Sequence, residues 1–148
     1  MKSILFVCLG NICRSPLAQG IAEKIIKEKT LNMRVDSAGT GDWHIGESPC
    51  ENSIKVASLN KVDISQQKGR QVTLYDLQTY DIIVALDDSN IENINKVGKC
   101  NLVKLGSYGH NNEDVPDPYF FDGFDGFDKV FTMIESCVIQ LLDEHAHD

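Results

Sequence analysis

The chain contains few aromatic residues, few prolines and no long apolar run. Aromatic residues make up 7% of its 148 residues, with one tryptophan and four prolines. No stretch approaches the roughly 20 apolar residues that a membrane-spanning helix needs. The apolar start at residues 3–9 is too short for a secretion signal and lacks a small-residue cleavage site. We therefore expect no membrane insertion, no export and a cytoplasmic location.

Basic residues and regularly spaced cysteines are also scarce. Fourteen Lys and Arg face 22 Asp and Glu, and a net charge of −8 argues against binding to nucleic acid. Five scattered cysteines are an odd number, which does not suit a disulfide scaffold. His145 and His147 lie in an acidic tail rather than in a ligand constellation. We predict no metal and no cofactor.

What the chain does contain is an ordinary globular composition, 42% hydrophobic and 24% charged, in a length that suits one domain over residues 1–148. Strand-like and helix-like segments alternate along it. The expected strands are 3–7, 33–38, 81–86 and 101–105, and the expected helices are 16–29, 49–59, 89–97 and 126–144. This alternation predicts an α/β fold with a mainly parallel sheet.

Residues 7–16, with the sequence VCLGNICRSP, join the first expected strand to the first expected helix. Ser15 suits a helix N-cap and Pro16 the first helical position. Gly10 permits unusual backbone angles. The loop can thus aim several N–H groups and the positive end of a helix at one point. We interpret it as a binding site for a phosphate-like dianion.

Cys8 and Arg14 supply chemistry at that point. A helix N-terminus and a guanidinium favour a thiolate, so Cys8 is the expected nucleophile. The planar fork of Arg14 can hold two phosphate oxygens. A lone cysteine after a strand is more often a packing residue, but here the residues come as a set. Neither a Gly-Lys-Ser/Thr nucleotide loop nor a Gly-x-Gly-x-x-Gly motif is present.

The segment from Cys8 to Pro16 resembles the signature of the low-molecular-weight protein tyrosine phosphatases. The resemblance continues in the family's order through Asp36–Thr40, Trp43, Gly69–Gln71, Asp87–Asn90 and Asp117–Tyr119. It implies a doubly wound, three-layer fold, in which helices flank both faces of a four-stranded parallel sheet. It also implies hydrolysis of phosphotyrosine through a phosphocysteine intermediate.

The resemblance assigns roles to particular residues. Cys8, Arg14 and Asp117 become the catalytic residues, with Asp117 as the general acid and base. On the residues alone, Asp114, Asp122, Asp125 and Asp128 are equal candidates for that acid. The phosphate-binding residues become Leu9, Gly10, Asn11, Ile12, Cys13, Arg14 and Ser15.

Further roles follow from the same resemblance. Trp43 and Tyr119 become walls of the substrate pocket. Asn11, Ser15 and Ser37 become supports of the loop, in a network where many relatives have a histidine and this chain has Gln67.

The remaining cysteines differ in their expected roles. The resemblance favours Cys13 as a redox partner that traps oxidised Cys8 as a disulfide. Cys50, Cys100 and Cys137 are most simply buried thiols.

Three other functions stay open on the sequence. Phosphoarginine phosphatases of this family tend to carry Thr at the position of Ile12, which favours phosphotyrosine here. Arsenate reductases of the same scaffold need additional redox cysteines, whereas Cys100 stands alone after the third expected strand. A phosphopeptide-binding module would need neither thiol nor acid. The expected partner is a phosphotyrosine protein, and a tyrosine kinase is a candidate partner.

Overall fold

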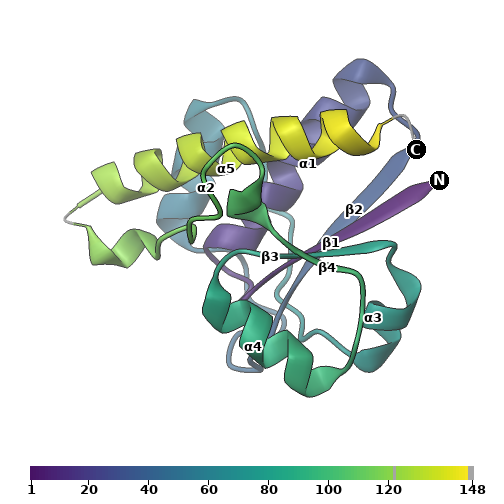
Figure 1. Ribbon diagram of the computed structural model, residues 1–148. Helices are drawn as coiled ribbons and strands as arrows, with labels where there is room; N and C mark the ends of the chain where they lie inside the picture. Colours follow the sequence, from purple (N-terminus) through teal and green to yellow (C-terminus); the bar gives the residue numbers. More distant parts are fainter. Residues whose placement is uncertain (122, 147–148) are drawn as a thin grey trace.

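A four-stranded parallel sheet forms the centre of the molecule, in a computed structural model that describes residues 1–121 and 123–146. Its strands are β1 (Lys2–Cys8), β2 (Met33–Gly39), β3 (Ile82–Ala85) and β4 (Leu102–Lys104). They lie in the order β2-β1-β3-β4, and all neighbouring pairs are parallel (Figure 1). The predicted fold class is confirmed.

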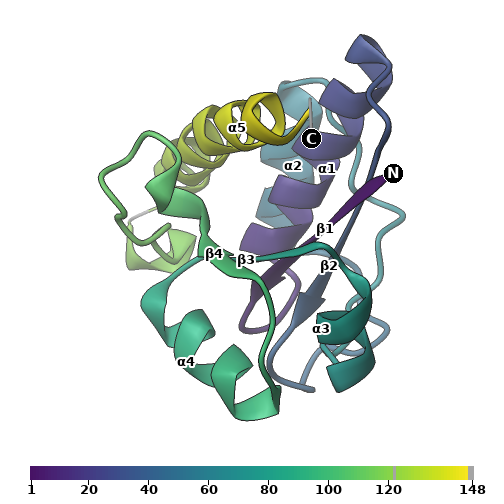
Figure 2. The same cartoon turned by 45° about the vertical axis from the view of Figure 1, so that its right-hand side comes forward.

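Helices cover both faces of this sheet (Figure 2). One face carries α1 (Arg14–Lys29), α2 (Glu51–Leu59) and α5 (Asp125–His145). The other carries α3 (Leu74–Thr79) and α4 (Asp88–Val97). The short 3₁₀ helices η1 (Leu105–Ser107) and η2 (Pro118–Phe120) lie between β4 and α5. No helix within residues 1–121 and 123–146 is long and apolar enough to cross a membrane.

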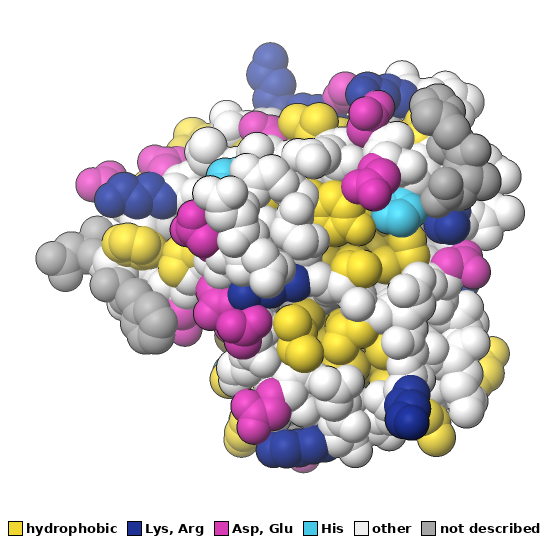
Figure 3. Space-filling model, viewed as in Figure 1, with side chains coloured by type: hydrophobic (Ala, Val, Ile, Leu, Met, Phe, Trp, Pro, Cys, Tyr) yellow, Lys and Arg dark blue, Asp and Glu magenta, His cyan; other side chains and the backbone are white. Residues whose placement is uncertain are grey.

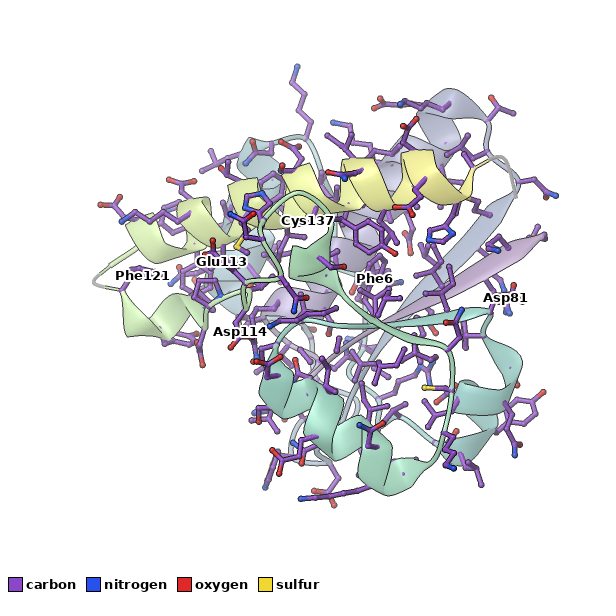
Figure 4. The ribbon with its side chains drawn as sticks, in the orientation of Figure 1. Phe6, Asp81, Glu113, Asp114, Phe121 and Cys137 are labelled. Carbon is purple, nitrogen blue, oxygen red and sulfur yellow. A yellow bond between two sulfur atoms is a disulfide. The ribbon has the colours of Figure 1, made fainter. Side chains whose placement is uncertain are left out.

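The strand β1 divides the core into two apolar clusters. Successive side chains of a strand point to opposite faces, so Ile4 and Phe6 pack with α1 and α5, while Leu5 and Val7 pack with α3 and α4. All four side chains are fully buried. Figure 4 shows Phe6 between the sheet and α5. A strand that is apolar on both faces is therefore fixed at the centre of the sheet.

The winding of the sheet reverses beside β1. The chain passes from β1 to β2 on one side and then returns to β3 on the other. Ligands in open α/β sheets bind beyond the carboxyl ends of the strands that flank such a reversal. Cys8 is the last residue of β1, so the fold places the predicted loop at this point.

Two local predictions need correction. The helix α1 begins at Arg14 with Cys13 as its N-cap and no side-chain cap, so Ser15 is a buried residue of the first turn rather than the cap. The helix α3 was not predicted, because its six residues are too few to show a helical period. Asp122 and His147 lie outside the described residues.

Asp76 joins α3 to the loop before it. It completes a capping box with Thr73, and its Oδ2 accepts a hydrogen bond from Arg70 Nη1 at 2.9 Å. Burial would raise the pKa of Asp76, but the bonds from Arg70 and Thr73 outweigh burial and hold that pKa below its ordinary value. Such a carboxyl stabilises the folded state above its ordinary pKa of about 4. The contribution is lost as pH falls through the lower folded-state value.

We therefore expect Asp76→Asn to lower the free energy of unfolding by about 1 kcal/mol at pH 7. The difference from the unaltered protein should shrink between pH 7 and about pH 2, because Asp76 becomes increasingly protonated and neutral, as the asparagine is at both pH values. Urea unfolding at the two pH values measures this. Asp143→Asn, at an exposed position of α5, is the control and should show no such pH-dependent difference. An equal loss for Asp76→Asn at both pH values would contradict the expectation.

Candidate active site

A pocket of about 200 Å³ opens at the carboxyl end of β1. It brings together residues of the loop after β1, residues 43–44 and the loop before η2. The predicted residues that line it are Cys8, Leu9, Gly10, Ile12, Cys13, Arg14, Trp43, Asp117 and Tyr119. The pocket thus joins parts of the chain that are more than 100 positions apart in the sequence. Asn11, Ser15 and Ser37 lie behind this lining and are buried.

Carbonyl groups of the loop at residues 8–14 point away from the pocket. The outward bonds run to Cys8 O from Thr40 N (2.9 Å), to Leu9 O from Gly41 N (2.9 Å), to Ile12 O from Cys50 N (2.7 Å) and to Cys13 O from Ser53 Oγ (3.1 Å). In a planar trans peptide the next N–H points opposite to the carbonyl. The N–H groups of residues 9, 10, 13 and 14 therefore point inward, as an anion-binding loop requires.

Asn11 holds the loop in this shape. Its φ of 57° is left-handed, a conformation that asparagine tolerates better than most residues. Its Nδ2 donates to Ser15 Oγ and to Ser37 Oγ, both at 2.9 Å, and its Oδ1 accepts from Arg70 N at 3.1 Å. These partners come from α1, β2 and the segment before α3, so the side chain fixes the loop to three parts of the fold.

The Cys8 sulfur lies at the floor of the pocket. Its Sγ is 3.0 Å from Ser15 Oγ, and Cys8 is only 3% exposed. Ser15 Oγ accepts a hydrogen bond from the side-chain Nδ2 of Asn11. The Ser15 hydroxyl hydrogen can therefore be donated to the Cys8 sulfur. A hydroxyl hydrogen, the inward N–H groups and the first turn of α1 all favour negative charge on Sγ.

Arg14 is positioned by two acceptors. Its Nη1 donates to Asp87 Oδ2 and to the Val115 carbonyl, each at 2.7 Å. The other oxygen of Asp87 accepts from Asn90 N at 2.7 Å and so caps α4. Among the described residues, all hydrogen bonds of Arg14 come from Nη1, which leaves Nε and Nη2 to bind two phosphate oxygens.

Asp117 is distinguished from the other aspartates by its place in the pocket. Its Oδ1 accepts from Tyr119 N at 2.9 Å, and Pro116 and Pro118 stiffen the backbone on either side. Asp114 instead pairs with a lysine, and Asp125 and Asp128 lie in the first turn of α5. Among the candidate aspartates that the structure describes, Asp117 is the one that lines the pocket.

Lys104 ties the loop that carries Asp117 to α4. This buried lysine, with a side chain 7% exposed, has Nζ 2.7 Å from Asp114 Oδ1 and 2.9 Å from Asp88 Oδ1. The hydrogen bond from Lys104 holds the pKa of Asp114 below its ordinary value, although burial opposes this. Asp114 lies beside the start of α4 (Figure 4). The pair anchors the loop three residues before Asp117.

Positive charge at the pocket is local. The chain has a net charge of −8, and the face in Figure 3 carries acidic side chains over α4 and the loop before η2. Surface charges are screened over about 10 Å at ordinary salt. The inward N–H groups and Arg14 can therefore attract a phosphate despite the overall charge.

One cysteine prediction needs correction. Cys13 forms a disulfide with Cys50, with Cα atoms 5.3 Å apart, while Cys8 is a free thiol. Cys50 is thus not the free buried thiol that we expected, and the capture of oxidised Cys8 by Cys13 stays a prediction. The two cysteines are 37 positions apart. Only the docking of α2 against the loop reveals that they meet.

The network around Ser37 contains a glutamine, but it is not Gln67. Gln67 donates to the Pro16 carbonyl at 3.1 Å instead of joining the Asn11 network. Gln19 takes part instead, because its Oε1 accepts the Ser37 hydroxyl at 2.6 Å. The position of Gln19, one helical turn after Ser15, could have suggested it as a member of the network. The sequence could not have shown that its partner is Ser37.

His44 is a pocket residue that the sequence analysis missed. It lines the pocket beside Trp43, and its Nδ1 lies 2.9 Å from Glu47 Oε2. A single histidine in a loop carries no pattern that would identify it. No group of three His, Cys, Asp or Glu side chains within residues 1–121 and 123–146 could hold a metal ion.

The arrangement defines a class of enzyme. A thiol lies beneath a cradle of N–H groups, a guanidinium is fixed beside it, and a carboxyl faces the same pocket. These groups can attack phosphorus, bind its oxygens and transfer a proton to the leaving group. They are the parts of a cysteine-dependent phosphomonoester hydrolase.

Comparison with known proteins gives the same class. The model of the family "Low molecular weight phosphotyrosine protein phosphatase" matches residues 3–148. The low-molecular-weight protein-tyrosine-phosphatase PtpA of Staphylococcus aureus is 38% identical over 148 residues, 97% of this chain and 93% of PtpA. This chain belongs to the low-molecular-weight protein tyrosine phosphatase family, and it is a phosphatase.

Solved structures agree with this assignment. YfkJ from Bacillus subtilis superposes with a TM-score of 0.89 at 36% identity, over 97% of this chain and 94% of that chain. A protein tyrosine phosphatase from Entamoeba histolytica gives 0.92 at 29% identity, over 99% and 98%. The drosophila arginine phosphatase DARP gives 0.89 at 30% identity, over 98% of each chain.

We expect Asn11→Ala to weaken binding of inorganic phosphate at least about 10-fold, because the lost hydrogen bonds hold the N–H groups inward. Competitive inhibition by phosphate measures this. Asn111→Ala is the control, because Asn111 is also left-handed, with a φ of 54°, but is exposed and does not line the pocket. It should leave phosphate binding unchanged. Equal inhibition constants for Asn11→Ala and the unaltered enzyme would contradict the assigned role.

Proposed function

We propose that this phosphatase hydrolyses phosphotyrosine in two steps, with Cys8 as nucleophile and Asp117 as proton donor and then acceptor. The observation that carries the proposal is that the two side chains line one pocket of about 200 Å³ with Arg14 between the loop and the acid segment. Binding alone would require neither a thiol nor an acid. A thiol on the phosphate-binding loop is useful only if it reacts.

In the first step, Cys8 Sγ attacks phosphorus as the bond to the tyrosyl oxygen breaks. Asp117 gives its proton to that oxygen, which leaves as a neutral phenol. The inward N–H groups and Arg14 stabilise the charge on the equatorial oxygens. In the second step, Asp117 removes a proton from water, which attacks the phosphocysteine and releases phosphate and the Cys8 thiolate.

The walls of the pocket support an aromatic substrate. Trp43 and Tyr119 line the pocket with 66% and 64% of their surfaces exposed. The Tyr119 ring packs edge-on against the Phe127 ring, with the ring centroids 5.3 Å apart. A phosphotyrosine ring could stack on these side chains. Ile12 adds an aliphatic surface to the pocket.

Phosphoarginine is the second candidate substrate. It is favoured by the likeness to the drosophila arginine phosphatase. Ile12 stands against it, because the polar group expected for a guanidinium phosphate is replaced by a methylene and methyl surface. We therefore place phosphotyrosine first.

The substrate also suggests a setting. Phosphotyrosine in a protein is made by a tyrosine kinase, so we propose that such a kinase supplies the substrate of this phosphatase. A reducing cytoplasm would keep the Cys8 thiol available for attack.

We expect Cys8→Ser to lower kcat for p-nitrophenyl phosphate at least about 1,000-fold, because a neutral hydroxyl is a much weaker nucleophile. Cys100→Ser is the control, because Cys100 packs in the cluster beneath α3 and α4, and it should keep full activity. Phosphotyrosine and phosphoarginine peptides are tested alongside with the unaltered enzyme. Faster release from phosphoarginine would reverse the order of substrates. Thiol-dependent arsenate reduction without phosphate release would refute the function.

We expect the effect of Asp117→Asn to depend on the leaving group. Loss of a general acid costs about 100-fold or more where the leaving oxygen must be protonated. A p-nitrophenolate departs without a proton, so that substrate should lose much less in the first step. The ratio of kcat/KM for phenyl phosphate and p-nitrophenyl phosphate measures this, with Asp125→Asn on α5 as the control. An unchanged ratio would assign the acid to another residue.

A further inference from the structure

The loop at residues 8–14 carries a second sulfur, and that sulfur has a partner outside the loop. Cys8 and Cys13 line the same pocket, and Cys13 is joined to Cys50. Cys13 therefore shares a pocket with Cys8 while it is bonded to Cys50. Cys50 is the N-cap of α2, a helix that packs beside α1 (Figures 1 and 2).

The approach of Cys50 to Cys13 does not depend on the disulfide alone. Cys50 N donates to the Ile12 carbonyl at 2.7 Å, and Ser53 Oγ donates to the Cys13 carbonyl at 3.1 Å. Both bonds join α2 to the loop through backbone carbonyls. They would remain after reduction, so the two thiols would stay next to each other.

The other two cysteines do not compete in this exchange. Burial raises the pKa of Cys137 to about 11, and it also raises the pKa of Cys100. Thiols kept protonated are poor nucleophiles. Cys137 lies in α5 within the core (Figure 4), and Cys100 packs with the cluster under α3 and α4.

We propose that Cys8, Cys13 and Cys50 form a redox relay that transfers oxidation from the nucleophile to the Cys13–Cys50 pair. This site takes a hydroperoxide as oxidant and a dithiol as reductant. The inference rests on the proposed role of Cys8 as the reactive thiolate. It assigns Cys50 the function of restoring the Cys8 thiolate once, before an external dithiol is needed to reset the pair.

The relay balances in three steps. The Cys8 thiolate attacks hydrogen peroxide, which leaves the sulfur as a sulfenic acid and releases hydroxide. Cys13 attacks that sulfur, and the Cys8–Cys13 disulfide forms as water leaves. The Cys50 thiolate then attacks Cys13 Sγ, the Cys13–Cys50 bond forms and Cys8 leaves as a thiolate. The two electrons that reduce the peroxide thus come from Cys13 and Cys50.

The last step has a direction. Cys8 is the better leaving group, because Ser15, the inward N–H groups and the start of α1 all favour charge on its sulfur. Cys50 also lies at a helix N-terminus, as the N-cap of α2, but among the described residues no hydroxyl group is within hydrogen-bond distance of its sulfur. The relay acts once and is reset when an external dithiol attacks the Cys13–Cys50 bond, forms its own disulfide and frees two thiols.

The test starts from the fully reduced enzyme and one equivalent of hydrogen peroxide, followed by alkylation and mapping of the disulfides by mass spectrometry. The unaltered enzyme should contain the Cys13–Cys50 bond, with Cys8 alkylated. A parallel sample without alkylation should keep at least about 10-fold more activity than Cys50→Ser. That variant should accumulate the Cys8–Cys13 bond and recover its activity with dithiothreitol. Cys100→Ser is the control and should behave as the unaltered enzyme.

Cys8→Ser provides a separate test, because the relay begins at Cys8. In this variant the Cys13–Cys50 bond should form at least about 10-fold more slowly with peroxide. Formation at the unaltered rate would overturn the relay, as would accumulation of a Cys8–Cys13 bond in the unaltered enzyme. The sulfur bonds are read by mass, independently of phosphate release. A failure of the relay is therefore distinguishable from a failure of the proposed phosphatase mechanism.

Discussion

The direction of a few peptide groups determines what this fold can do. Carbonyls of Cys8, Leu9, Ile12 and Cys13 are turned outward by donors from the segments around the loop, so the following N–H groups face the pocket. None of these donors belongs to the loop itself. The anion site is therefore a property of the packed domain. A short peptide with the same loop sequence would have no reason to keep its N–H groups convergent.

Arg14 connects the phosphate-binding loop to the segment that carries Asp117. Its Nη1 joins the Asp87 carboxylate after β3 to the Val115 carbonyl of the loop that carries Asp117. Lys104 at the end of β4 fastens the same loop through Asp114. The charged side chains of Arg14 and Lys104 thus orient the acid segment, and Arg14 can also bind phosphate. The carboxyl ends of three parallel strands supply the nucleophile, the guanidinium's support and the anchor of the acid segment.

Much of the fold was predictable, because its signals are local. β1 is apolar on both faces, and α5 repeats its apolar positions with a helical period, so both elements and the parallel sheet followed from the residue pattern. The helix α3 did not follow, since six residues held by a capping box show no period. The start of α1 was misplaced because Ser15 and Pro16 resemble a cap, whereas the Ser15 hydroxyl serves Cys8 and Asn11.

The site was predictable where the sequence is contiguous and not where the packing decides. Cys8 and Arg14 lie in one loop, and the resemblance to the phosphatase family pointed to Asp117, which lines the same pocket. Cys50 and Gln19 could not be placed, because each acts through a contact made by the docking of a helix or a strand.

The contact of α2 with the loop is the most consequential of these. Two hydrogen bonds that shape the anion site also hold the Cys50 sulfur beside Cys13. The same packing therefore serves binding and thiol exchange. Any change that loosens α2 should impair both together, whereas loss of the sulfur alone should impair only one.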